Sequence, residues 1–261
     1  MAGDIRLSRS GAVATVTLVN AGKLNAVDAA MWQRLHAVMN ECSRDDSLRC
    51  VVLRGDGDKA FAAGGDIEEF SRLRDTRERA RIYHDEWVGR ALASLRDCRH
   101  PTLAMVRGHC IGGGLEIAAQ CDLRLCGESA RFGIPIGRLG FTMYHSELAA
   151  LIELTGAAVV LELLLEGRIL DAREAFAKGI VGRVLPDDRL EEEAHASARR
   201  IAEGAPLAAR AHKRLVRRLA WAARPLEETE VLENLAFLDT DDYREGVRAF
   251  LAKEAPRFRG Q

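Results

Sequence analysis

The chain has 261 residues, with 38 Lys or Arg against 39 Asp or Glu, so its formal net charge is −1. This length suffices for one large domain, or for a main domain with a smaller appendage. Because basic and acidic residues interleave, the sequence argues against a broad basic face for nucleic acid.

The cysteine spacing and the hydropathy pattern argue against a metal-binding, membrane or secreted protein. The six cysteines include no C-x-x-C pair and no His/Cys spacing of a metal site, so we expect buried or free thiols in a reducing compartment and no bound metal. The apolar run 151–165 is interrupted by Glu153 and Glu162, which excludes a membrane span, and the first residues alternate as in a strand rather than a signal peptide. We expect a soluble, cytoplasmic protein without a membrane anchor.

Strand-like and helical segments alternate along most of the chain. Strands are expected at 12–19, 50–54, 102–107 and 122–126, and helices at 28–43, 67–99, 114–120 and 146–165. This alternation predicts an α/β fold. From about residue 195 onward the pattern is helical and charged, without strand candidates.

Two glycine-bearing loops are the most informative feature of the sequence. They span 59–66 and 109–116, and the second lies between a buried strand and a helix. Glycine lets a ligand approach the main chain without a Cβ in the way, so the N–H groups of Gly65 and Gly113 are candidates for an oxyanion hole. The positive end of the helix dipole would favour negative charge on a substrate oxygen there.

Other glycine motifs fit less well. Gly112, Gly113 and Gly114 are contiguous, so they do not match the G-x-G-x-x-G dinucleotide fingerprint, and no Lys-Ser or Lys-Thr of a Walker loop follows. Either loop alone would also suit an ordinary strand-to-helix turn. However, each glycine in a helix costs about 1 kcal/mol relative to alanine, so three at a helix start indicate a specific need for them.

The motifs and their order resemble the enoyl-CoA hydratase/isomerase (crotonase) superfamily. The similarity runs nearly end to end, through residues 23–26, 60–67, 108–116, 121–122, 130–133, 166–172, 179–181 and 241–258. The resemblance implies a crotonase-like ββα spiral with a C-terminal helical oligomerisation region. Residues 1–195 would form the core with an acyl-CoA site, and residues 196–261 would pack between protomers of a homotrimer or a hexamer of two trimers.

The resemblance also implies roles for particular residues. Gly65 and Gly113 would bind the thioester oxygen of an acyl-CoA, and Glu116 would be a catalytic carboxylate. The CoA moiety would be held by Lys23, Ala26, Lys59, Ala63, Gly64, Asp66 and Ile67. No cofactor beyond the CoA moiety of the substrate is implied. An early-turn glutamate is also a routine partner for a helix dipole.

One departure from the family pattern concerns the second catalytic carboxylate. Hydratases of the family carry glutamate in a Phe-Gly-x-Pro-Glu segment, whereas this chain has isoleucine at position 136. An aliphatic side chain can neither take nor give a proton. The segment that follows places Tyr144, His145 and Glu147 where a substitute acid or base would enter, and His84 is a weaker candidate.

Three functions remain open from the sequence. The first is an enoyl-CoA hydratase or isomerase working mainly through Glu116, since one carboxylate can shuttle a proton between C2 and C4. The second is another crotonase-type reaction on a specialised acyl-CoA, such as decarboxylation or C–C bond chemistry, with Tyr144 or His145 taking part. The third is a CoA-ester-binding or RNA-associated protein with residual activity, which the balanced charge disfavours.

Overall fold

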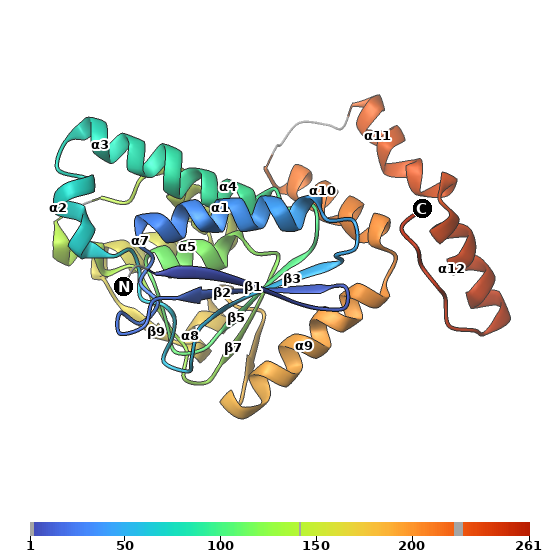
Figure 1. Cartoon of the computed structure of the whole chain (residues 1–261), viewed down its shortest axis with the longest axis horizontal. Helices are drawn as coiled ribbons and strands as arrows, with labels where there is room; N and C mark the ends of the chain where they lie inside the picture. The colour runs from blue at the N-terminus through green and yellow to red at the C-terminus, as the bar shows by residue number, and fades with distance from the viewer. Residues whose placement is uncertain (1–2, 141, 222–226) are drawn as a thin grey trace.

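A six-stranded sheet forms the centre of the molecule. The computed structural model describes residues 3–140, 142–221 and 227–261 (Figure 1). The sheet has the order β1-β2-β3-β5-β7-β10. Its strands are β1 Asp4–Ser10, β2 Val13–Val19, β3 Cys50–Gly55, β5 Thr102–Val106, β7 Leu123–Gly127 and β10 Arg183–Leu185. β1 and β2 pair antiparallel, and all the other pairs are parallel.

A second, smaller sheet makes the fold a spiral. Its order is β4-β6-β8-β9, with β4 Ala60–Ala62, β6 His109–Ile111, β8 Arg131–Gly133 and β9 Ile169–Asp171. β3, β5 and β7 of the large sheet are each followed by a strand of the small sheet and then by helix, which is the ββα repeat that the resemblance implied. The strands of the small sheet were not predicted, because three residues are too few to show a period.

Helices cover both faces of the large sheet. On one face, α1 (Ala29–Arg44) begins at Asp28, whose carboxylate accepts the Met31 N–H at 2.8 Å, and buries Trp32 and Leu35 in the main core. On the other face, α9 (Asp187–Glu203) packs apolar side chains on the sheet. Alternation along β3 serves both layers, since Leu53 joins the α1 core and Val52 the α9 core.

The helix predicted over 67–99 is broken, and so is the one over 146–165. The first region contains η1 Ile67–Glu69, α2 Phe70–Leu73, α3 Arg77–Ile82, the π-helical segment η2 Tyr83–Gly89 and α4 Arg90–Arg96. The second contains α6 His145–Thr155, α7 Ala157–Leu161 and the π-helical η4 Glu162–Glu166. The break between α6 and α7 is at Gly156, whose φ of 80° is accessible to glycine but costly for other residues.

Beyond β10 every described element is a helix, as predicted: α9, α10 Pro206–Trp221, α11 Glu228–Leu235, η5 Ala236–Asp239 and α12 Asp241–Ala252. In Figure 1, α11 and α12 stand apart from the body of the molecule, at the right. α9 runs through residue 195 and buries Ala194 and Ala198 against the sheet. A division between 195 and 196 would therefore cut a helix that belongs to the core.

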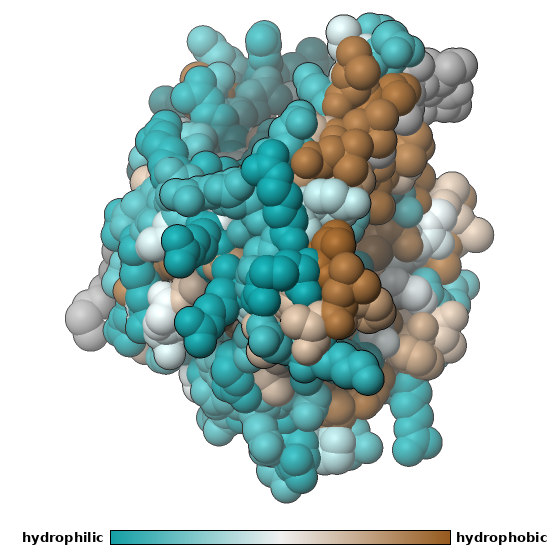
Figure 2. Space-filling view, turned by 90° about the vertical axis from the view of Figure 1, so that its right-hand side faces the viewer, coloured by the Kyte–Doolittle hydropathy of each residue, from teal (hydrophilic) through white to brown (hydrophobic). Residues whose placement is uncertain are grey.

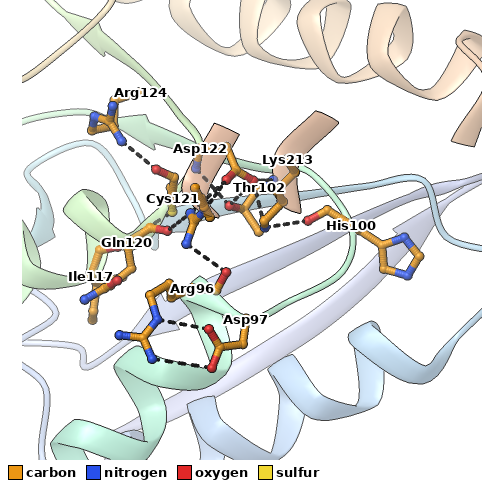
Figure 3. A network of polar contacts seen from close by, with 11 residues as sticks. Arg96, Asp97, His100, Thr102, Ile117, Gln120, Cys121, Asp122, Arg124 and Lys213 are labelled. Atoms are coloured by element: carbon orange, nitrogen blue, oxygen red, sulfur yellow. Dashed lines mark hydrogen bonds and ion pairs between the residues drawn. The ribbon is translucent and has the colours of Figure 1, made fainter. Parts of the chain in front are cut away.

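A half-buried carboxylate anchors α10 to the core (Figure 3). Asp122 accepts the Thr102 N–H and the ammonium of Lys213, both at 2.8 Å, and also the Arg217 guanidinium at 2.8 Å. Arg217 also donates to the carbonyls of Gln120 and Arg96, each at 2.8 Å. α10 is thus fixed on the junctions that flank β5 and β7.

Candidate active site

One pocket collects most of the residues singled out in the sequence. Its walls come from both glycine loops, from Trp32 of α1, from the helical segments between 67 and 88, and from residues 135–147. Two of these walls belong to α5 Gly113–Gln120 and η3 Pro135–Leu139, whereas α8 Ala172–Ala177 contributes no wall residue. Apart from a few titratable groups, the walls are apolar side chains and glycine backbone.

The small sheet brings the two glycine loops together. β4 and β6 pair in parallel, with Ala60 opposite His109, so the loops that follow them emerge at the same edge. A Cβ built on Gly113 would lie only 3.5 Å from the backbone nitrogen of Gly65. Two backbone N–H groups from distant parts of the chain therefore reach the same part of the pocket wall.

The Gly113 amide precedes the hydrogen-bond ladder of its helix. The ladder of α5 starts with the Glu116 N–H, which donates to the Gly112 carbonyl at 2.9 Å. The N–H of Gly113, one turn earlier, has no partner within the helix. Gly114 is needed for packing, because a Cβ there would lie 2.3 Å from the Ala62 carbonyl oxygen.

The loop around Gly65 is fixed by its neighbours. The Val27 N–H donates to the Gly64 carbonyl at 2.8 Å, and the Asp66 N–H donates to the Val27 carbonyl at 3.0 Å. These two bonds hold the peptide groups on both sides of Gly65. A preorganised donor of this kind needs no rearrangement when charge develops on a bound oxygen.

Glu116 lies in the wall on the first turn of α5 and is 8% exposed. Burial raises the pKa of its carboxyl well above the ordinary range, and the nearby negative charge of Glu147 raises it further. The guanidinium of Arg74, which also lines the pocket, opposes this shift. Glu116 therefore holds a proton at pH values where an exposed glutamate has lost it.

A second carboxylate and an imidazole line the same pocket. The Nδ1 atom of His84, on η2, lies 2.5 Å from Oε1 of Glu147, on the first turn of α6. Their side chains are 8% and 5% exposed. The Tyr144 backbone N–H donates to the other oxygen of Glu147 at 3.3 Å.

Tyr144 and His145 do not line this pocket. The ring of Tyr144 stacks on His84, with centroids 4.7 Å apart, and its hydroxyl bonds to Asp85, which raises the pKa of the phenol. His145 is exposed at the start of α6. Successive helical residues are rotated by about 100° around the helix axis. Glu147 is two positions after His145, so it faces the pocket while His145 faces solvent. The structure thus brings Glu147 and His84 to the pocket, although His84 was the weaker candidate from the sequence, and it leaves Tyr144 and His145 outside the walls.

Three of the seven residues assigned to the CoA moiety line the pocket, and the other four do not. Ala63, Gly64 and Ile67 line the pocket, with Ile67 54% exposed at its rim. Asp66 caps η1, and its carboxylate lies 2.7 Å from the Lys23 ammonium, which also contacts Glu68 at 2.7 Å. These carboxylates raise the pKa of Lys23. Ala26 and Lys59 lie outside the pocket walls.

Ile136 lies in η3 and forms part of the pocket wall, so the departure from the family pattern is at the site itself. Within residues 3–140, 142–221 and 227–261, no group of three or more His, Cys, Asp or Glu could hold a metal ion. The six cysteines are all buried thiols. None of the described helices is long and apolar enough to cross a membrane.

The model of the family described as enoyl-CoA hydratase/isomerase matches residues 8–261. The chain belongs to this family. It is 33% identical to the probable enoyl-CoA hydratase echA8 of Mycobacterium bovis, over 97% of each chain. It is 31% identical to the carnitinyl-CoA dehydratase of Salmonella typhi, over 100% of each chain.

Solved structures agree with this assignment. An enoyl-CoA hydratase/carnithine racemase from Magnetospirillum magneticum is 47% identical, with a TM-score of 0.96 over 98% of this chain and 96% of that chain. An enoyl-CoA hydratase from Bacillus anthracis is 26% identical, with a TM-score of 0.89 over 98% of this chain and 99% of that chain. The chain is therefore a crotonase-family enzyme acting on acyl-CoA thioesters, as the sequence motifs predicted.

Proposed function

We propose that this enzyme hydrates a 2-enoyl-CoA, or dehydrates the corresponding 3-hydroxyacyl-CoA, by stabilising a thioester enolate. The observation that carries the proposal is the meeting of the Gly65 and Gly113 amides in one pocket with the protonatable carboxyl of Glu116. Two N–H donors on the thioester oxygen stabilise the charge that develops there, and one such donor is typically worth about 10²–10³ in rate. The carbon chain then becomes electrophilic at C3 and accepts a proton at C2.

The CoA moiety would lie along the loop 63–67, against the exposed side chain of Ile67 at the rim. For Lys23 to meet a CoA phosphate, its ammonium would have to exchange part of its contact with Asp66 and Glu68. Lys59 is exposed at the start of the first glycine loop. Unlike Lys23, it would not have to give up contacts with Asp66 and Glu68 to meet a phosphate. Tyr144 and His145, outside the walls, would act through the groups that they cover rather than on the substrate.

Isomerisation of a 3-enoyl-CoA is the second candidate. It needs only one carboxylate to move a proton between C4 and C2, so Ile136 does not impair it. The presence of Glu147 and His84 beside Glu116 favours hydration, which needs a second acid–base group. Decarboxylation and C–C bond chemistry remain the alternatives on a specialised acyl group.

Turnover and exchange assays test the proposal together. Wild-type enzyme should hydrate crotonyl-CoA, measured as loss of enoyl absorbance, and should exchange the α-protons of butyryl-CoA in D₂O, measured by NMR. Exchange requires only the enolate, whereas hydration also requires activated water. An enzyme that does neither, over a panel of acyl chain lengths, would refute enolate chemistry at this site.

We further propose that α11 and α12 pack on neighbouring copies of this chain, in a trimer or a hexamer. Figure 2 shows a band of apolar side chains over the side of the molecule from which these helices project. Phe250 and Leu251 of α12 are 83% and 75% exposed, and Leu232 of α11 is 58% exposed. Large apolar side chains at this exposure on adjacent helices are typical of a protein interface.

A further inference from the structure

The pocket contains an acid–base pair that lies outside the motifs through which the sequence resembles the family. His84 and Glu147 come from segments 63 residues apart, and their side chains meet at 2.5 Å in the wall that also holds Glu116 and Ile136. Burying a charged side chain is costly unless it is paired, and buried titratable groups in clefts are often functional. Such a pair at the wall of a reaction pocket is therefore a candidate for chemistry.

Glu147 is held in one position. One of its oxygens contacts His84, and the other accepts the backbone N–H of Tyr144. Its place in the first turn of α6 adds the favourable field of the helix N-terminus for a negative charge. The carboxylate is therefore fixed and can orient its partner.

The imidazole of His84 is held as firmly. Tyr144 stacks on one side, at 4.7 Å between centroids, and Tyr83 packs edge-on, at 5.2 Å and 84°. With a carboxylate at Nδ1, the neutral ring places its proton on that atom and its lone pair on Nε2. Nε2 makes no hydrogen bond to any part of the chain that the structure describes. The ring is part of the pocket wall.

We propose that His84, oriented by Glu147, is the second acid–base group of this site and takes the part that isoleucine at position 136 cannot. This inference rests on the proposed hydration. A base held in one tautomer by a carboxylate is the arrangement that activates a weak nucleophile in many hydrolytic enzymes. Here the nucleophile is water, and Glu147 is a positioning residue.

Hydration then requires two proton transfers. His84 Nε2 takes a proton from water while the water oxygen forms its bond to C3. The C2=C3 electron pair moves toward the thioester, and the enolate oxygen is bound by the N–H groups of Gly65 and Gly113. C2 takes a proton from the carboxyl of Glu116. Proton exchange with solvent returns His84 to the neutral form and Glu116 to the acid, and the net change is addition of one water.

The environment of Glu116 agrees with this division of labour. Its carboxyl is kept protonated by burial and by the negative charge of Glu147, so it starts the cycle as the acid. Ile136 would then line the acyl chain and exclude water from C2. Glu116 is thus the proton donor of the cycle, and His84 is the proton acceptor.

The test compares His84→Gln, Glu147→Gln and the double variant in crotonyl-CoA hydration. His84→Gln should lower kcat by about 100-fold or more, the usual loss for a general base, with KM changed less than about threefold. Glu147→Gln should lower kcat less, and should cost little further once His84 is glutamine, because burial, the larger cause of the raised Glu116 pKa, remains in the variant. Added imidazole should restore activity to His84→Ala in proportion to its concentration.

His195→Gln is the matched control. His195 lies 3.9 Å from Glu191 on the surface of α9, so this change also removes the imidazole of a His–Glu pair, but outside the pocket. It should leave kcat within about twofold of wild type. Thermal unfolding of each variant identifies losses that come from misfolding.

The outcomes separate this inference from the proposed function. If wild type neither hydrates nor exchanges α-protons, enolate chemistry itself is wrong. Wild type that exchanges but hydrates no enoyl-CoA would overturn the role of His84 in activating water and leave enolate chemistry standing. If hydration survives in His84→Gln, or imidazole gives no rescue of a folded His84→Ala, the inference fails while the proposed function holds.

Discussion

The backbone nitrogen of Gly65 lies 3.5 Å from the position that a Cβ on Gly113 would take. A side chain at Gly113 would therefore lie beside the Gly65 amide, in the wall where the two glycine loops meet. It would also approach the Trp32 ring to 3.2 Å. This relationship explains why the first helical residue of α5 is glycine, and it makes position 113 the sharpest probe of the site.

Gly113→Ala should lower kcat on the true acyl-CoA by about 10²–10³-fold, because the methyl group displaces the thioester oxygen from at least one donor. The measurement is steady-state turnover, with binding of a non-reactive CoA thioester followed by calorimetry. Gly182→Ala is the control, since the nearest atom to its added methyl lies at 3.7 Å. Equal activity of the two variants would remove Gly113 from the site.

Glu116→Gln should lower kcat by at least about 100-fold, while the affinity for the CoA moiety changes little. The amide keeps the size of the side chain but transfers no proton. α-Proton exchange of butyryl-CoA should fall in parallel with hydration. Exchange at the wild-type rate would assign the proton at C2 to another residue.

The pH dependence of stability should also change in Glu116→Gln. The pKa of Glu116 is raised in the folded state, so the folded protein retains a proton that the unfolded chain loses. The stability that this proton contributes is fully present below the unfolded pKa and is lost as pH rises toward the folded pKa. Glu116→Gln should therefore match wild type near pH 4 and exceed its melting temperature at pH 8. A wild type that is as stable at pH 8 as the variant would refute the raised pKa.

Ile136→Glu should restore the carboxylate that the family pattern carries in η3. In the His84→Gln background it should raise crotonyl-CoA hydration by about 10-fold or more, since a new proton acceptor then faces the same pocket. Ile136→Leu in the same background serves as the control and should add nothing. Failure of the glutamate to raise activity in a folded variant would place position 136 away from C3.

Phe250→Asp should disrupt assembly. Phe250 is 83% exposed on α12, and a charge there would oppose burial against another copy of the chain. Light scattering should show a trimer or hexamer for wild type and a smaller species for the variant. Phe176→Asp, on α8 and 53% exposed, is the control and should leave the mass unchanged. A wild-type monomer at micromolar concentration would refute the interface.

Much of the fold follows from local patterns. β2, β3, β5 and β7 and the helix α1 lie within a residue or two of the expected ranges, because period and capping act over a few residues. The α/β class follows from their alternation. The two glycine loops and the family resemblance also pointed to Gly65, Gly113 and Glu116 together, and the parallel pairing of β4 and β6 brings all three to one pocket.

The tertiary structure decided which titratable groups share the pocket with Glu116. Nothing in the spacing of His84 and Glu147, 63 residues apart, predicts their contact at 2.5 Å, because it depends on how η2 and α6 pack. Tyr144 and His145 looked equivalent to Glu147 in the sequence, and only the rotation of α6 turns Glu147 inward. Local sequence determined the main strands, the helix α1 and the two glycine loops. Packing between distant elements determined which titratable side chains share the pocket.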